Sequence, residues 1–406
     1  MIASIIAVAA TLVVWSLLAR KFEQWRFTAP LVVVVAGAVV GLTVRDTIGE
    51  TLSTEAALRA AEITLAILLF VDAADVRGGM LGSHPGAALR VLLIALPLSL
   101  AAAVALGWWL LPGVGWPVLL VLACVVVPTD FAPAQAILRD PRLPVRVRDV
   151  LNVEGGYNDG IVSPVILFAL VLAGDTHAAR TPWEALASAG PSALKALLVG
   201  FALGALLGFL VNRADRAGSM STQSKRLVPV AAPLLVYATA VGIGGNGFVA
   251  SFVCGVVFHA VGHKAQTHRE MELIDDVGFL LGVVMWFVFG TTAVFALWGG
   301  VDWQLVVFSA AALTVVRMVP VLLSLIGSKV PAREGVLIGW LGPRGTTSIV
   351  FGLLAFNELH DDDGILVLTI LVVTVLGSIA LHGLGSPVTA RKYGPQEPGQ
   401  ASASAK

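Results

Sequence analysis

The sequence predicts an all-α polytopic membrane protein with about 13 transmembrane helices. Of its 406 residues, 57% are hydrophobic and 13% are charged, and the mean hydropathy is +0.89. Several windows hold more than about 18 mostly apolar residues, which is enough to span a bilayer. We therefore expect a lipid bilayer as the surroundings. The formal net charge of zero gives no indication of a partner, and we expect no nucleic acid.

The expected spans follow one another along the chain with short loops between them. The first has no basic residue before it and has Arg20 and Lys21 after it. This predicts a retained span, because a cleaved signal has a basic start. The thirteen ranges are 2–19, 29–44, 58–74, 88–111, 116–138, 150–173, 191–212, 226–243, 247–262, 276–298, 303–327, 335–357 and 364–385.

Basic residues indicate the orientation of these spans. With the N-terminus outside, most of the 26 Lys and Arg residues fall in cytoplasmic segments, in agreement with the positive-inside rule. Only Arg45, Arg59, Arg180 and Lys195 fall in outside loops. The distribution predicts a multi-pass protein of the cell membrane with its N-terminus outside and its C-terminus in the cytoplasm.

Two of the expected spans are interrupted. The fifth contains Pro128–Asp130, and the twelfth contains Gly342–Gly345. Proline lacks a backbone donor and glycine weakens a helix, so both spans should unwind there. The breaks lie seven spans apart, so two inverted six-helix repeats joined by the seventh span would place them at equivalent positions, crossing at the midplane. Such paired interruptions indicate the binding site of a transporter.

The sixth span carries the residues that best indicate function. Asp159 follows Asn158 within an apolar stretch, and Glu154 shares a helix face with Asn158. Carboxylates at membrane depth are costly and usually mark an ion or proton path, and burial lets such a group titrate near neutral pH. We interpret Asp159 as a site where a proton and a metal cation compete, the alternative being a structural salt bridge.

Residues at the breaks and in the eleventh span complete the candidate site. Thr129 offers hydroxyl and carbonyl oxygens that suit an alkali cation, and Asp130 either binds the cation or accepts hydrogen bonds from freed amides of its own span. Arg317 lies deep in its span and must be paired. Either Arg317 or Arg344 can neutralise Glu154, which we interpret as structural. Arg344 is also expected to bind the carbonyl groups exposed at its own break.

Two further residues concern access to the site. Asp72 closes the third span near its cytoplasmic end, where it is either a solvated residue or part of an access path. Gly155 lies one turn before Asp159 and leaves space beside that carboxylate. We therefore expect any path from the cytoplasm to pass Asp72 and Gly155.

The stretch 128–164, with Pro-Thr-Asp and then Asn-Val-Glu-Gly-Gly-Tyr-Asn-Asp-Gly, resembles the NhaP-type sodium/proton antiporters of the monovalent cation/proton antiporter family. Gly245–Gly255, Gly342–Gly345 and His382–Leu384 are similar to further blocks of that family. The resemblance implies thirteen helices, a homodimer, and a core that moves against a dimerisation part. It also implies ion binding by Thr129, Asp130 and Asp159, with bracing by Glu154, Asn158 and an arginine.

The resemblance also implies a domain organisation. A membrane domain of residues 1–386 would contain a core bundle at about 88–173 and 303–386. The dimerisation part would comprise about 1–74 and 226–298, with a linker helix at 191–212. Residues 387–406 are rich in Gly, Pro, Ser and Ala and are expected to form a short disordered cytoplasmic tail.

The chain departs from the family pattern close to the site. Gly155 and Tyr157 stand where serine and leucine are frequent, and Phe131 follows Asp130 where proline is common. The glycine removes one hydroxyl ligand. The preference among sodium, lithium and potassium therefore stays open at this point.

These observations predict an electroneutral antiporter that exchanges one sodium or lithium ion for one proton by alternating access and serves pH homeostasis. Potassium/proton exchange at the same residues is the alternative. No cofactor and no enzymatic reaction are expected. An intramembrane aspartyl protease is a distant alternative, but Tyr157–Asp159 does not supply the Gly-x-Gly-Asp-like element that it would need. A channel is disfavoured by the single titratable site without a filter-like repeat.

Overall fold

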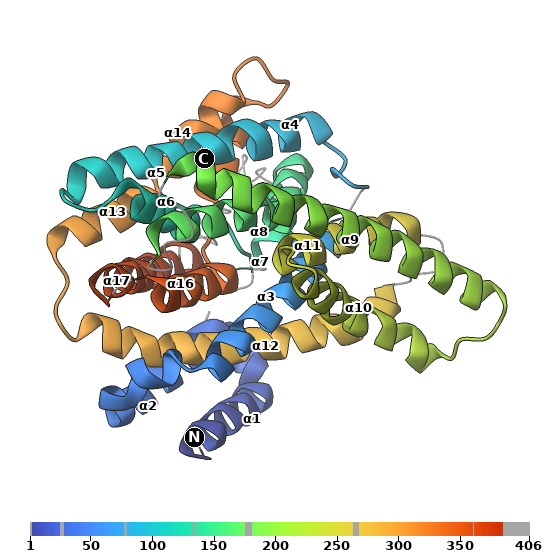
Figure 1. The fold of residues 1–406 in the computed structure, drawn as a ribbon, viewed down its shortest axis with the longest axis horizontal. Coiled ribbons are helices and arrows are strands. Elements are labelled where there is room, and N and C mark those ends of the chain that lie inside the picture. The colour runs from blue at the N-terminus through green and yellow to red at the C-terminus, as the bar shows by residue number, and fades with distance from the viewer. Residues whose placement is uncertain are drawn as a thin grey trace, which may run out of the picture.

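The computed structural model describes residues 2–24, 28–76, 79–131, 134, 136–174, 181–262, 268–359 and 361–384. These residues form helices joined by short connections, and no strand occurs among them. Figure 1 shows several long helices lying roughly side by side, with α12 and α2 along one edge of the view and α4 and α5 along the other. The predicted tail, 387–406, lies outside the described residues.

The helices follow one another along the chain with few residues between them. In order they are α1 (Ile2–Gln24), α2 (Ala29–Leu52), α3 (Glu55–Ala74), α4 (Pro85–Arg90), the π-helical turn η1 (Val91–Ala95), α5 (Leu96–Leu110), α6 (Trp116–Val126), α7 (Ala136–Arg139), α8 (Val145–Ala173), α9 (Pro182–Arg216), α10 (Thr222–Gly242), α11 (Gly247–Gly262), α12 (His268–Leu297), α13 (Trp303–Leu313), α14 (Val315–Ser324), α15 (Ala332–Trp340), α16 (Thr346–Glu358), α17 (Asp361–Ser378) and the π-helical η3 (Ile379–Leu384).

Every range that was expected to span the membrane overlaps one or more of these helices. Within the described ranges, 6 helical stretches are long and apolar enough to cross a membrane, by length and composition. The expected linker, 191–212, was too short, because α9 begins at Pro182 and continues through Pro191. Proline is tolerated inside a membrane helix where its surroundings satisfy the freed backbone groups. The number of crossings stays a prediction.

The helices pack in two groups. In the first, α2 packs along α12, and α11 packs against α3 and α9. The α9 helix approaches α11 closely because Gly200, Gly204 and Gly208 face it. In the second group, α6 packs against α5 and α8, and α17 packs against α13 and α16. The groups touch at several places: α3 and α12 pack against α16, α12 also packs against α17, and α8 packs against α3, α9 and α11.

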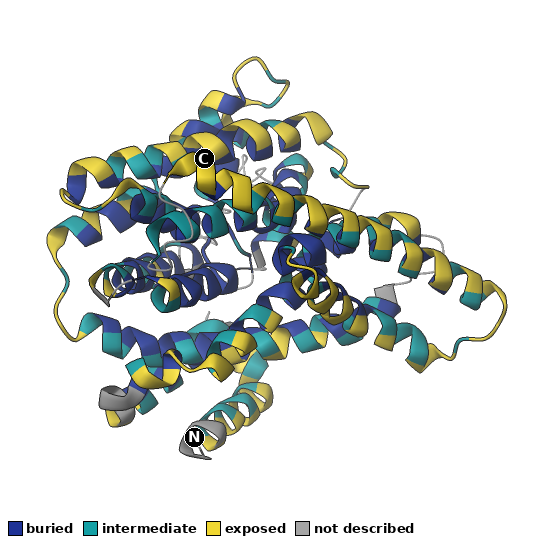
Figure 2. Ribbon diagram, in the orientation of Figure 1, coloured by how far each residue is buried: buried dark blue, intermediate teal, exposed yellow. Residues whose placement is uncertain are grey.

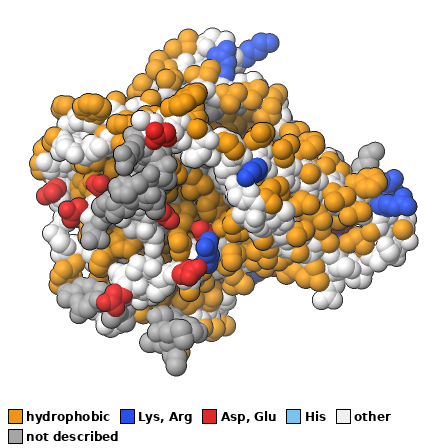
Figure 3. All heavy atoms as spheres, viewed as in Figure 1, with side chains coloured by type: hydrophobic (Ala, Val, Ile, Leu, Met, Phe, Trp, Pro, Cys, Tyr) orange, Lys and Arg blue, Asp and Glu red, His pale blue; other side chains and the backbone are white. Residues whose placement is uncertain are grey.

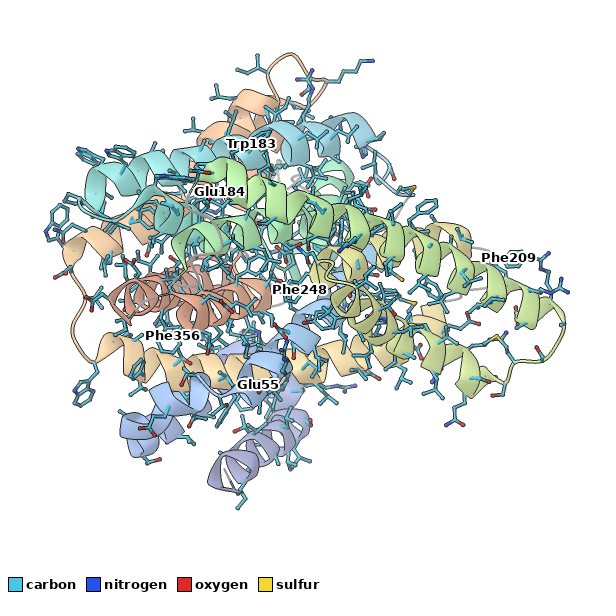
Figure 4. The ribbon with its side chains drawn as sticks, in the orientation of Figure 1. Glu55, Trp183, Glu184, Phe209, Phe248 and Phe356 are labelled. Carbon is cyan, nitrogen blue, oxygen red and sulfur yellow. The ribbon has the colours of Figure 1, made fainter. Side chains whose placement is uncertain are left out.

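The surface is apolar over much of its area. Figure 2 shows α16 and α17 largely buried, whereas α9 is exposed along one side. Trp183 and Phe209, both exposed, lie toward opposite ends of α9 (Figure 4). In Figure 3, hydrophobic side chains cover most of the visible face, and Lys and Arg gather at its right-hand end and top. An exposed apolar surface of this extent fits contact with lipid.

Both predicted interruptions are present. The α6 helix ends at Val126, and α7 begins at Ala136. The α15 helix ends at Trp340, and α16 begins at Thr346. The prolines and glycines of these gaps release backbone donors and acceptors from the helical pattern. The inverted-repeat relation between the two halves stays a prediction.

Candidate functional site

The two broken spans touch at Asp130. Its backbone N–H donates to the Pro343 carbonyl over 2.9 Å, and its Oδ2 accepts from the Thr346 backbone N–H over 2.6 Å. A carboxylate at the first turn of α16 is stabilised by the free amides and the helix dipole. Of the two roles left open for Asp130, cation ligand or acceptor from freed amides of its own span, neither is decided by this bond. The amide that binds it here belongs to the twelfth span, since the start of α16 faces this carboxylate.

Glycine is required beside this contact. A Cβ atom at Gly345 would collide with the Asp130 carboxylate. The residue before α16 must therefore lack a side chain if Asp130 is to reach the Thr346 amide. The glycine of the break thus permits a close approach in addition to weakening the helix.

Arg344 is fully buried and binds backbone carbonyls. Its Nε donates to the Val126 carbonyl at the end of α6. Its two terminal nitrogens donate to the carbonyls of Gly342 and Ala312. The guanidinium therefore stabilises the negative ends of α6 and α13 together with its own break. The backbone N–H of Arg344 donates to the Ser378 hydroxyl over 2.7 Å.

Arg317, and not Arg344, pairs with Glu154. Both terminal nitrogens of Arg317 bind the Glu154 carboxylate, the second over 2.9 Å. The same guanidinium donates to the carbonyls of Gly339 and Ile338 over 3.1 and 3.0 Å. Both side chains are buried, so this bidentate pair satisfies two charges and ties α8 to α14 and α15.

Asn158 connects α8 to the break after α6. Its Nδ2 donates to the carbonyl oxygen and to the hydroxyl oxygen of Thr129, each over 2.8 Å. Its Oδ1 accepts from the Asp159 backbone N–H over 2.6 Å. Both Thr129 oxygens that could bind a cation therefore lie at the contact between the break and α8.

Asp159 differs from the other acids of the site. Its side chain is 1% exposed, and neither carboxylate oxygen has a hydrogen-bond partner among the described residues. The charge of Arg344 acts on it, and the Thr347 side chain lies near enough for a weak polar interaction, but neither forms a hydrogen bond of normal geometry with it. A buried carboxylate without such partners is costly in its ionised form. A proton or a cation would relieve that cost.

A cavity of about 260 Å³ opens beside the first break. Asp72 and Gly155, the two residues expected along an access path, both line it, as does Asp130. Asp159 is not among the described residues that line the cavity. The lining residues are Asp72, Asp75, Asp130, Phe131, Leu138, Arg139, Val145, Arg148, Asp149, Asn152, Gly155 and Gly156.

Charged residues surround this cavity on the side of the connection between α7 and α8. Arg139, Arg148 and Asp149 line it. In the adjoining turn Arg142 binds Asp140, with Nη2 and Oδ2 at 2.6 Å. This hydrogen bond holds the pKa of Asp140 below its usual value, so the turn keeps both charges at neutral pH.

Sequence reasoning did not assign roles to two residues that support the second break. The imidazole Nε2 of His382 lies 3.0 Å from the Trp340 carbonyl at the end of α15, and Ser378 receives the Arg344 amide. His382 belongs to a sequence block that resembles the family, which was a usable signal. Ser378, a lone serine in an apolar span, had no such signal in the sequence.

Two interrupted helices that meet beside a buried carboxylate define the class of secondary transporters. Residues 7–392 match the family described as "Sodium/hydrogen exchanger, transmembrane". The match covers nearly the whole chain, and the protein therefore belongs to that family, whose members are membrane antiporters.

Two similar proteins and one solved structure are informative. The chain is 28% identical over 284 residues to the K(+)/H(+) antiporter NhaP of Alkalimonas amylolytica, covering 69% of this chain and 48% of that protein. It is 25% identical over 258 residues to a Na(+)/H(+) antiporter of Schizosaccharomyces pombe, covering 60% and 55%. This chain thus spans about half the length of these relatives.

The fold is shared with the sodium proton antiporter MjNhaP1 from Methanocaldococcus jannaschii, with a TM-score of 0.79 and 20% identity. The alignment covers 97% of this chain and 99% of the other. At this sequence identity, the structural similarity establishes a shared fold.

Proposed function

We propose that this protein is an electroneutral cation/proton antiporter that exchanges one sodium or lithium ion for one proton. The observation that carries the proposal is the Asp159 carboxylate, which is buried and has no hydrogen-bond partner among the described residues. Such a group alternates between a protonated state and a cation-bound state because the bare anion is costly. Binding one species excludes the other, which couples their movements.

The neighbouring residues have supporting roles in this mechanism. The Thr346 amide binds Asp130 and favours its ionised form, and that charge would attract the cation. Thr129 supplies oxygen ligands, and Asn158 holds Thr129 against α8. Glu154 and Arg317 neutralise each other and brace the core. Arg344 holds the broken helix ends together. The protein needs no cofactor and catalyses no chemical reaction.

Alternating access would come from movement of one helix group against the other. The core bundle would comprise α4–α8 and α13–α17, and the dimerisation part α1–α3 and α10–α12, with α9 as the linker. The protein would act as a homodimer in the cell membrane, N-terminus outside and C-terminus in the cytoplasm, and would contribute to pH homeostasis. The cavity lined by Asp72 and Gly155 would then be the cytoplasmic access path.

Potassium is the second candidate cation. It is supported by the name of one relative, a K(+)/H(+) antiporter, and by a Bacillus subtilis relative named for sodium, potassium, lithium and rubidium. Gly155 also supplies no side-chain oxygen to a small cation. Proton movement in vesicles, followed with a pH-sensitive dye across lithium, sodium, potassium and rubidium, identifies the cation. An antiporter responds to one or more of them, whereas a protease responds to none.

The aspartyl protease alternative has little support in the geometry. A catalytic dyad shares a proton between two adjacent carboxyl groups. Asp130 instead accepts from the Thr346 amide, and Asp159 makes no hydrogen bond to any described residue. The two aspartates therefore lack the shared hydrogen bond of a dyad.

Exchange is expected to be electroneutral. Asn158 is uncharged and Asp130 stays ionised, so Asp159 alone alternates between proton and cation and one charge replaces another. The rate in proteoliposomes should not change when a potassium–valinomycin clamp sets the membrane potential, if sodium is the transported ion. A rate that rises strongly with the imposed voltage, or a sustained current on a supported membrane, contradicts one-for-one exchange.

Replacing Asp72 by asparagine is expected to raise the half-saturating cation concentration with little change in the maximal rate. Asp72 lines the cavity beside Asp130, where an ionised carboxylate would concentrate cations. Initial exchange rates measured over a cation titration give both quantities, and Glu184→Gln, on the exposed start of α9, is the control. An unchanged titration curve removes Asp72 from the access path.

A further inference from the structure

Two departures from the family pattern, Phe131 and Gly155, meet in space. A Cβ atom at Gly155 would lie 2.8 Å from Cδ2 and 3.2 Å from Cε2 of Phe131. The first distance is shorter than any real contact of this kind, so the phenyl ring lies directly on the backbone of α8. Any side chain at position 155 would force the ring to move. Phe131 can therefore occupy this position only because residue 155 is a glycine.

The contact forms part of the cavity wall. Phe131 and Gly155 both line the cavity, yet Asp159, one turn further along α8, does not. Residues four apart share a helix face, so the face that carries Asp159 is the one that the ring covers at Gly155. Phe131 follows Asp130 directly in the chain and is 6% exposed, so little of the ring faces the cavity.

We propose that Phe131, seated on Gly155, is the apolar barrier between the cavity and Asp159, and that residue 155 controls its position. The mechanistic consequence rests on the proposed antiport function. A hydrated cation in the cavity cannot pass the ring until the ring moves and the cation loses part of its water shell. The pair thereby acts as a positioning element for access and does not itself bind the cation.

Accessibility of position 159 tests the barrier without requiring transport. Cys124 and Cys254, both buried free thiols, are replaced by alanine, and Asp159→Cys is introduced into this background. We expect slow reaction of that thiol with a small cationic thiol reagent in the purified, detergent-solubilised chain. Adding Phe131→Ala should accelerate the reaction severalfold, whereas Leu138→Ala, which removes another apolar side chain of the cavity wall, should not. Equal rates with and without the ring overturn the proposal.

Exchange rates measured for the variants of a double-mutant cycle test the role of Gly155. With Asp159 intact, Gly155→Ser should lose most of the exchange rate, because the new Cβ displaces the ring into the cavity. Phe131→Ala in the Gly155→Ser background should restore much of it. Phe131→Leu, which keeps an apolar side chain, should behave like the parent and shows that position 131 tolerates substitution.

The outcomes separate this proposal from the proposed function. If the parent chain moves no protons in response to any cation, the antiport function fails, while the thiol-labelling rates still decide whether the ring is a barrier. If the parent transports and Gly155→Ser transports equally well, the control assigned to residue 155 is wrong. The control assigned to residue 155 is also wrong if the folded double variant, Gly155→Ser with Phe131→Ala, is no more active than folded Gly155→Ser.

Discussion

Replacing Asp159 by asparagine is expected to reduce cation-dependent proton exchange to the background of empty vesicles. The substitution removes the only group to which we assign proton carriage and leaves an uncharged amide that cannot take up or release a proton near neutral pH. Because no described residue forms a hydrogen bond of normal geometry with this carboxylate, the substitution breaks no such bond, and thermal stability and oligomeric state should be unchanged. Dye-monitored exchange in proteoliposomes, with thermal unfolding of the purified protein, gives both results.

The matched control is Asp302→Asn. Asp302 precedes α13, is exposed, and makes no side-chain capping hydrogen bond. The exchange rate of the Asp302→Asn variant should therefore equal that of the parent. Substantial residual exchange by the Asp159 variant would show that another group carries the proton. A folded Asp159 variant that still binds the cation with parental affinity would remove Asp159 from the ligand set.

Replacing Glu154 by glutamine is expected to cause the largest loss of stability. The change leaves the buried Arg317 guanidinium without its carboxylate, and breaking a buried ion pair from one side costs about 3–5 kcal/mol. We expect a lower yield of folded protein and a clearly lower thermal unfolding temperature in detergent. The folded remainder should keep a near-parental apparent affinity for the cation.

Glu334→Gln is the control for this loss. It breaks the ion pair of Glu334 with Arg146, in which Arg146 Nη1 and Glu334 Oε2 lie 3.3 Å apart and the side chains are 32% and 21% exposed. Partly exposed pairs contribute about 0–1 kcal/mol, so its unfolding temperature should change little. Should folded Glu154→Gln protein show a large shift in apparent cation affinity, Glu154 would be a ligand and its structural assignment wrong.

Local signals in the sequence were sufficient for the helices and their breaks. Apolar windows predicted the spans, since burying that much apolar surface requires a membrane or a larger core. Pro128 and Gly342 predicted the interruptions through the backbone donor that proline lacks and the freedom that glycine adds. Helix ends were less well predicted. Polar turns extend α2 and α12 beyond their apolar parts, and hydropathy detects the apolar part alone.

The sequence by itself determined the fold class, the two broken spans and the acid in span six, because each depends on residues within a few turns of one another. Only the tertiary structure decided the partners. Arg317 lies 163 positions from Glu154, and Asp130 lies 216 positions from Thr346. Which of two buried arginines reaches a given carboxylate depends on how the helices cross, and no local pattern records that. The same holds for Phe131 and Gly155, whose contact arises only where the first break crosses α8.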